Sequence, residues 1–141
     1  MLIGSEVDVV AKMLCEREAP TQSAANIRNY KAILMNRFDG LHTIEVDIPR
    51  YKRSERPWAA WGEAWPASPP WWTAYNSVKH RRDTNFQDAN QGNVINALCG
   101  LMALLLYWMR DEVHLQPYPE LLDYGFPATI VTDGIKALPG L

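Results

Sequence analysis

The chain has little of several things that would assign a function directly. Among its 141 residues are two cysteines and three histidines, and neither set has the spacing of a metal site. The formal net charge is only −2, so no global positive field draws the whole protein to nucleic acid. A glycine-rich phosphate loop, an internal repeat and a Ser/His/Asp order are also missing. We therefore expect no metal and no cofactor, and any polyanion must bind to a local cluster of cations.

Targeting and membrane signals are equally scarce. The N-terminus lacks a basic segment followed by an apolar run, which is the pattern of a secretory signal. The longest apolar stretch, residues 94–109, has sixteen residues and is shorter than a usual membrane span. Cys15 and Cys99 lie within apolar helical patterns, as expected of buried thiols in a reducing compartment. The sequence therefore predicts a cytoplasmic protein that does not enter a membrane.

Hydrophobic residues, in contrast, are plentiful. They make up 48% of the chain, with six tryptophans and six tyrosines, which is enough to bury a core without disulfides. We expect one domain over residues 1–141. Its first two helices are predicted over residues 5–18 and 24–38, where apolar residues recur at helical spacing. Thr21 or Ser23 would cap the second helix, and the short joint predicts an antiparallel hairpin.

From residue 41 the period of the hydrophobic pattern changes. Apolar and polar residues alternate over residues 44–48, which predicts a half-buried strand. The tail, residues 116–141, is broken by prolines and has a β-like run that ends near residue 132. We expect residues 129–131 to pair with the strand in a small two-stranded ribbon. The rest of the tail should be irregular and wrap back on the core.

A long proline-rich loop, residues 51–70, carries Trp58, Trp61 and Trp65. A loop of this length in a compact domain is either functional or packed by its own side chains. We expect its tryptophans to pack on the helices, because tryptophan is mostly buried in soluble proteins, with ligand stacking as the alternative.

Two more helices are predicted after this loop. The first would begin at a Ser68 cap and run to about residue 83. The second contains residues 94–109 and is apolar on nearly all sides, so it should be the central helix and pack directly on residues 24–38. Because three neighbouring helices are too few to cover the apolar surface of this helix, we expect a homodimer. The predicted class is all-α, a four-helix bundle with a small ribbon.

The helix before the central one carries the residues most typical of a functional site. Asn76 and His80 lie one helical turn apart, and Trp72 lies one turn earlier, so the three share a face. Three cations flank the histidine, namely Lys79, Arg81 and Arg82. No other stretch of the sequence brings a histidine, an amide and three cations together.

This segment resembles a known motif helix. From Trp72 to Arg81 it reads W-x2-Y-N-x2-K-H-R, which is similar to the YNxxKH form found in HEPN-like domains, small helical bundles common in bacterial toxin and defence systems. The resemblance covers residues 71–107 by motif and the remainder by helix order. In active members an arginine precedes the polar residue, whereas this chain has Tyr75 at that position.

The resemblance implies metal-independent cleavage of RNA, in which a ribose 2′-hydroxyl attacks the adjacent phosphate in a cleft often shared by two subunits. His80 would be the general acid or base, and Asn76 would orient the imidazole or the scissile phosphate. The RNA would be held by Lys79, Arg81, Arg82, Tyr75 and Trp72.

Tyr75 cannot act as a bidentate clamp on a phosphate, because it offers one neutral donor where arginine offers five charged ones. The missing guanidinium would have to come from another element or from a second subunit. Within the chain, the obvious substitutes are Arg50, Arg53 and Arg56, because their loop leads into the motif helix.

A structural interpretation of the same residues stands beside the functional one. Asn76 and His80 would form a hydrogen-bonded polar seam against the tryptophan-rich loop, and the neighbouring cations would only be solvated. The protein would then be a non-catalytic dimerisation or protein-interaction module, antitoxin-like or part of a larger defence assembly.

The other two histidines are weaker candidates. His114 follows the central helix, where a cation complements the helix dipole. His42 follows Arg37 at a spacing used by a large class of helical ribonucleases, but this spacing arises easily by chance. Gly40 also breaks the helix between the two residues, so we do not expect a site there.

Overall fold

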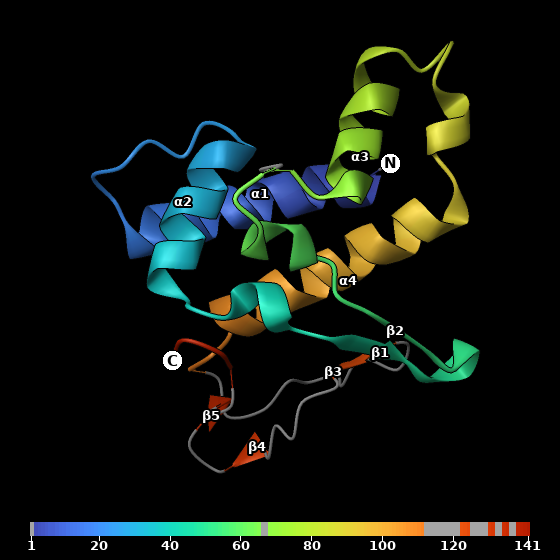
Figure 1. Ribbon diagram of the computed structural model, residues 1–141. Coiled ribbons are helices and arrows are strands. Elements are labelled where there is room, and N and C mark those ends of the chain that lie inside the picture. The colour runs from blue at the N-terminus through green and yellow to red at the C-terminus, as the bar shows by residue number, and fades with distance from the viewer. Residues whose placement is uncertain (1, 66–67, 112–121, 125–129, 132–133, 136–137) are drawn as a thin grey trace.

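The computed structural model describes residues 2–65, 68–111, 122–124, 130–131, 134–135 and 138–141. The described chain is mostly helical, with small antiparallel sheets at one end (Figure 1). Its α-helices are α1 (Leu2–Glu18), α2 (Ile27–Arg37), α3 (Pro70–His80) and α4 (Gln91–Trp108). The helix order expected from the hydrophobic periodicity is therefore present.

Helices α1 and α4 run side by side and parallel, although they are the first and last helices of the chain (Figure 1). At one end Ile3 and Val94 line the same pocket. At the other end the Arg17 guanidinium donates hydrogen bonds to the carbonyl oxygens of Tyr107 (3.0 Å) and Trp108 (2.9 Å). Arg17 thereby satisfies carbonyl groups that have no partner within the last turn of α4.

Helix α2 begins at a different cap from those expected. The side chain of Asn26 accepts hydrogen bonds from the backbone N–H groups of Arg28 (3.0 Å) and Asn29 (3.2 Å), so neither Thr21 nor Ser23 caps the helix. Asparagine satisfies the free N–H groups of a first turn as well as serine does. Asn26 also lies closer in the sequence to the apolar residues of this helix than Thr21 and Ser23 do.

The prediction that residues 24–38 pack directly against residues 94–109 is wrong. Helix α4 packs mainly on α1 and α3, and α2 packs mainly on α1. A ring contact joins the end of α2 to α4, where Phe38 lies 4.4 Å from Tyr107 between ring centroids. Helix α1 thus takes the place beside α4 that was expected for α2.

The expected strand forms, but its partners differ from those expected. Strand β1 (Val46–Ile48) pairs antiparallel with β2 (Arg53–Glu55) and with β3 (Asp123–Tyr124). A tight turn joins β1 to β2, and Lys52 adopts a left-handed conformation there with a φ of 49°. The start of the predicted proline-rich loop is therefore the second strand of a hairpin.

The prediction that residues 129–131 pair with the strand at residues 44–48 is wrong. Strand β4 (Ile130–Val131) instead pairs with β5 (Gly134–Ile135), and residues 123–124 take the second edge of β1. A partner only a few residues away costs less loop-closure entropy than one on the far side of the helices. The ribbon exists, but it is a local hairpin.

Tryptophan rings fill the space between the loop and the helices, as expected. Trp58 contacts Trp61 (4.2 Å between centroids) and Trp71 (5.1 Å), and the Trp58 indole donates to the carbonyl oxygen of Gly100 (3.1 Å). Trp65 is the exception, because 71% of it is exposed. The Arg28 guanidinium lies 5.7 Å from the centroid of the Trp65 ring.

Both cysteines are free and fully buried, which confirms the expectation of buried thiols. Burial raises the pKa of the Cys15 and Cys99 thiols to about 12, because a thiolate would lose its hydration. At neutral pH both groups are therefore neutral thiols, and neither has the character of a nucleophile.

Helix α4 is longer than its apolar run suggests. Asn90 caps it, so the helix starts at Gln91 and spans 18 residues with a mean hydropathy of 1.2. Among the described residues it is the one helix that meets the length and composition of a membrane span. Core helices of soluble proteins pass the same test, and 44% of this stretch is buried inside the fold. Its position between α1 and α3 is that of a core helix.

Candidate functional site

Helix α3 carries the predicted motif, and its ends differ from those expected. Pro69 is the residue before the helix and Ser68 makes no capping bond, so the start depends on the fixed φ of the two prolines. The helix ends at His80 and not near residue 83. The backbone N–H of Asn85 returns to the carbonyl oxygen of Arg81 (2.9 Å), which closes a turn immediately after the helix.

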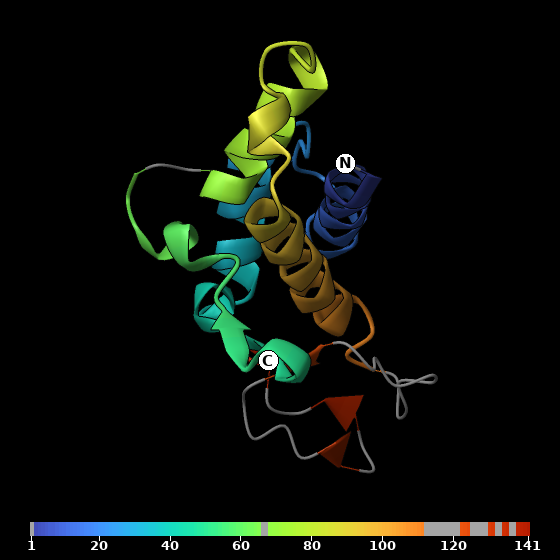
Figure 2. The same ribbon diagram turned by 90° about the vertical axis from the view of Figure 1, so that its right-hand side faces the viewer.

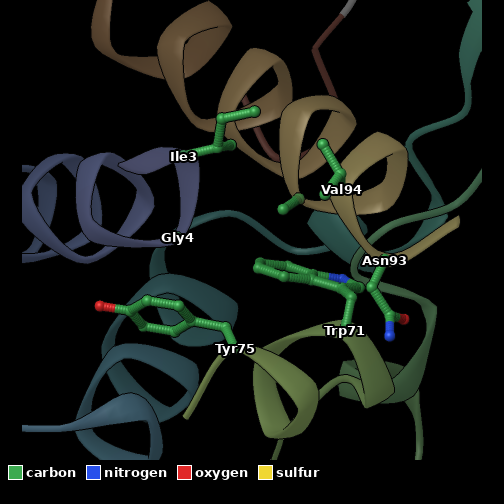
Figure 3. Close-up of a pocket in the computed structure, with 7 residues that line it drawn as sticks. Ile3, Gly4, Trp71, Tyr75, Asn93 and Val94 are labelled. Carbon is green, nitrogen blue, oxygen red and sulfur yellow. The ribbon is translucent and has the colours of Figure 1, made fainter. Parts of the chain in front are cut away.

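The inner side of α3 is part of the hydrophobic core. Trp72 and Tyr75 are 5% and 4% exposed, and the Tyr75 hydroxyl lies 3.2 Å from the Ser5 hydroxyl. The Tyr75 ring lies beneath the first turn of α1, where Gly4 has no side chain (Figure 3). A Cβ atom at Gly4 would come within 2.3 Å of the ring. The expectation that Trp72 and Tyr75 contact RNA is therefore wrong, because neither ring offers a free face.

The pocket in Figure 3 lies on this inner side. Its wall is mainly apolar and is formed by α1, α3 and α4; the lining residues are Ile3, Gly4, Trp71, Tyr75, Asn93, Val94 and Ala97. Among the described residues, no histidine or carboxylate lines it, so these residues offer no general base of the usual kind. This pocket is a packing defect between three helices, separate from the histidine.

The outer end of α3 is different. Lys79, His80, Arg81 and Arg82 are all exposed, while Asn76 is half-buried. The structure thus brings the predicted amide, histidine and cations to one end of one helix. Within the described part of the chain, neither the Asn76 nor the His80 side chain makes a hydrogen bond, so the polar seam of the structural interpretation does not form there.

No carboxylate in the described part of the chain pairs with the cations of residues 79–82. Most arginines elsewhere are paired: Arg17, Arg37 and Arg110 with Glu18, Arg53 with Glu55, and Arg56 with Glu45. Lys79 has an aromatic neighbour, the Tyr75 ring, at 5.6 Å from the centroid. We call residues 79–82 the basic end of α3.

The expected substitutes for the missing arginine do not reach this end. Arg50 follows β1, Arg53 lies in β2, and Arg56 comes just after β2. That hairpin lies near the bottom of Figure 2, whereas the end of α3 lies at the top. Arg53 and Arg56 are moreover engaged in the ion pairs given above. The structure therefore does not place a substitute guanidinium from this loop beside His80.

A polar turn that the sequence did not reveal folds back on the basic end. It contains the 3-10 helix η4 (Phe86–Asp88). The Ser77 hydroxyl donates to the Asp88 carboxylate (2.9 Å), and the Asn93 amide donates to the Asp88 carbonyl oxygen (2.9 Å). The turn brings an exposed aromatic residue, Phe86, close to the basic end. An isolated aromatic in a polar stretch was the only signal of it in the sequence.

The second histidine that the structure describes, His42, does not form a site with Arg37. Arg37 pairs with Glu18 (2.9 Å), and Gly40 adopts a left-handed φ of 88°, so the helix ends before His42. The His42 ring packs closely beneath Gly62, in agreement with our rejection of the Arg37–His42 spacing. His114 lies outside the described residues.

No group of three histidine, cysteine or acidic side chains is placed to hold a metal ion in the described ranges. In comparisons with known proteins, no family model, curated protein or solved structure matches the chain. The arrangement that defines the candidate site is thus a mostly helical fold in which four exposed basic residues lie at the end of one helix and just after it, with no acidic partner among the residues that the structure describes.

Proposed function

We propose that this protein is a HEPN-like helical bundle that binds RNA at the basic end of α3, as a component of a bacterial defence or toxin-type system in the cytoplasm. The observation that carries the proposal is the concentration of unpaired charge there. The exposed cations of residues 79–82 lack a described carboxylate partner, whereas Arg53 and Arg56 are neutralised by glutamates. With a net charge of −2, this is a local field suited to phosphates.

The histidine gives this end a means of moving protons. His80 is exposed, and an imidazole can both accept and donate a proton, so it suits a general acid or base in attack of a ribose 2′-hydroxyl on the adjacent phosphate. Asn76, one turn earlier, offers an amide that would orient the scissile phosphate. This reaction needs no metal or cofactor bound by the protein.

Catalysis needs a further cation for the charge that develops on the phosphorane. Tyr75 is in the core and the arginines of the β1–β2 hairpin are distant, so a second subunit is the source that the geometry favours. We therefore expect a single chain to be sufficient for RNA binding. RNA cleavage would require a homodimer in which two basic ends face one cleft.

The test is incubation of the purified protein with mixed single-stranded RNA in EDTA, followed by analysis for 2′,3′-cyclic phosphate ends. We expect His80→Ala to abolish cleavage without loss of stability, because its exposed ring contributes little packing, and Asn76→Ala to slow it less. Lys79→Glu and Arg81→Glu should weaken RNA binding and reduce its salt dependence. Arg50→Glu, at the other end of the molecule, is the matched control.

Three outcomes would count against parts of this proposal. Cleavage that persists in His80→Ala would remove the catalytic role of the imidazole. Equal loss of binding in Arg50→Glu and Arg81→Glu would show a general charge effect. A wild-type protein that neither cleaves nor binds RNA would favour the interaction module.

That module is the second candidate, and an apolar face formed by α1 and α4 supports it. On α4, partly exposed residues recur at intervals of four and three: Val94, Leu98, Leu101, Leu105 and Trp108. On α1, the exposed apolar residues are Leu2, Val9 and Met13. Heptad spacing is typical of a helix that packs on another helix, so we propose that a second copy of the chain covers this face.

Light scattering should then give twice the 16.1 kDa mass of one chain at micromolar concentration. Val9→Glu and Met13→Glu should reduce it to the monomer mass, because a dimer would bury these carboxylates without a partner. Asn36→Glu, an exposed change on α2, should leave the dimer intact. A wild-type monomer would contradict both the covered face and the shared cleft.

A further inference from the structure

We infer that Phe86 is a base-stacking residue and that the RNA bound at the basic end of α3 is therefore single-stranded. This inference rests on the proposed function and adds to it the form of RNA that is bound. It assigns the aromatic contact to a residue outside the motif, in place of the buried Trp72 and Tyr75.

The first observation is exposure. Phe86 is 71% exposed, and in the described part of the chain no ring or cation lies against it. Trp65 has the same exposed fraction, but its ring has the Arg28 guanidinium at 5.7 Å. An exposed ring keeps both of its faces open to a flat ligand, and covering its apolar surface on binding would be favourable.

The second observation is that the segment carrying Phe86 is anchored. The Ser77 hydroxyl donates to the Asp88 carboxylate at 2.9 Å, and the Asn85 amide side chain donates to the Ser77 carbonyl oxygen at 3.4 Å. These bonds tie η4 to the last turn of α3, on both sides of Phe86 in the sequence. The backbone that carries Phe86 is thus fixed beside the end of α3 before any ligand arrives, which lowers the entropic cost of binding.

The third step concerns what a phenylalanine can recognise. Its ring has no hydrogen-bonding group, so it contacts the face of a base and cannot read the edges. In a duplex the faces are covered by neighbouring base pairs, whereas in a single strand a base can turn out and stack on an aromatic side chain. Cations beside such a ring hold the phosphates, which is the usual arrangement in proteins that bind single strands without sequence preference.

The arrangement therefore separates two contributions to binding. Lys79, Arg81 and Arg82 supply a salt-dependent attraction to any phosphate backbone, and Phe86 adds a contact that only an unpaired base can make. The affinity for a single strand should exceed the affinity for a duplex of the same sequence because of the second contribution.

The experiment measures fluorescence anisotropy with three labelled ligands: a short uridine oligonucleotide, a duplex of equal length, and an oligonucleotide of equal charge whose bases are removed. We expect wild type to prefer the uridine strand. Phe86→Ala should weaken that complex about tenfold, to the level of the abasic ligand, and leave the abasic complex unchanged. Its salt dependence should stay that of wild type, because the phosphate contacts remain.

Matched variants distinguish stacking from other effects. Phe86→Trp should keep the preference for the uridine strand, and Phe86→Leu should lose most of it, because leucine is apolar but has no π face. Trp65→Ala, which removes an equally exposed ring at the other end of α3, should not change RNA binding.

Unchanged affinity in Phe86→Ala, or a wild-type protein that binds all three ligands equally, would overturn this inference while leaving RNA binding at the basic end intact. Loss of self-association in Phe86→Ala with unchanged RNA affinity would overturn it as well, because the ring would then be a protein contact. Absence of RNA binding in wild type would overturn the proposed function and this inference together.

Discussion

Replacing Glu18 with alanine is expected to lower the free energy of unfolding by about 3 to 5 kcal/mol. The Glu18 side chain is only 6% exposed, and its carboxylate forms ion pairs with three guanidinium groups. Arg37 at 2.9 Å and Arg17 at 3.1 Å donate hydrogen bonds to it, and Arg110 lies 2.7 Å away. Without the carboxylate, three cations would face one another in a partly desolvated space.

The position of Glu18 explains why the effect should be large. It lies at the end of α1, Arg37 ends α2, and Arg110 comes shortly after α4, so one carboxylate joins the ends of three helices. Arg17 also donates to the last carbonyl oxygens of α4, and this contact depends on the same guanidinium staying in place. The variant should therefore loosen the whole junction.

Glu16 provides a matched control on the same helix. It is 58% exposed and lies 4.0 Å from Lys12, one turn earlier, so Glu16→Ala should cost only about 0 to 1 kcal/mol. Both variants gain the same helix propensity. Urea denaturation followed by circular dichroism measures the difference, and values within about 1 kcal/mol of each other would show that the junction is not stabilising.

The second large effect is expected from Trp58→Ala, at about 3 to 5 kcal/mol. Trp58 is completely buried, contacts two other indole rings, and donates a hydrogen bond to the carbonyl oxygen of Gly100 in α4. The substitution removes the ring that connects the loop to the helices and leaves a buried carbonyl oxygen without that donor.

Trp65→Ala is the control, since it deletes the same side chain from the same loop where the ring is exposed. It should cost less than about 1 kcal/mol. Thermal and urea unfolding of the two variants would test the prediction. Similar losses would mean that the loop contributes through its chain conformation and not through the Trp58 ring.

Local patterns in the sequence were sufficient for the helices and for much of the core. Apolar residues at helical spacing mark four segments, and each of them contains an α-helix. The hydrophobic periodicity of a helix is visible within a few turns of sequence, so it can be recognised without knowing which elements pack against that helix. The burial of Cys15, Cys99 and Trp58 follows from the same local reasoning and from the general preference of these residue types.

Strand pairing and helix partners were beyond this kind of reasoning. The parallel packing of α1 on α4 joins residues about ninety positions apart, and the sequence offers many apolar stripes that would fit equally well. β1 accepts residues 123–124 in place of residues 129–131, because several short apolar runs satisfy the same alternation. Such choices depend on the sum of many small packing terms over the whole chain.

For the candidate site, too, some features follow from the local sequence and others from the tertiary structure. The sequence by itself determined that an amide and a histidine share one face of a helix, because helical geometry places residues four apart on one face, and that three cations flank the histidine. Only the tertiary structure decided which side of that helix is covered. Gly4 of α1 leaves room for Tyr75, so the tyrosine turns inward and the basic end stays in solvent. Phe86 enters the site because a bond from Ser77 to Asp88 closes the return turn, a contact between side chains that no spacing rule reveals.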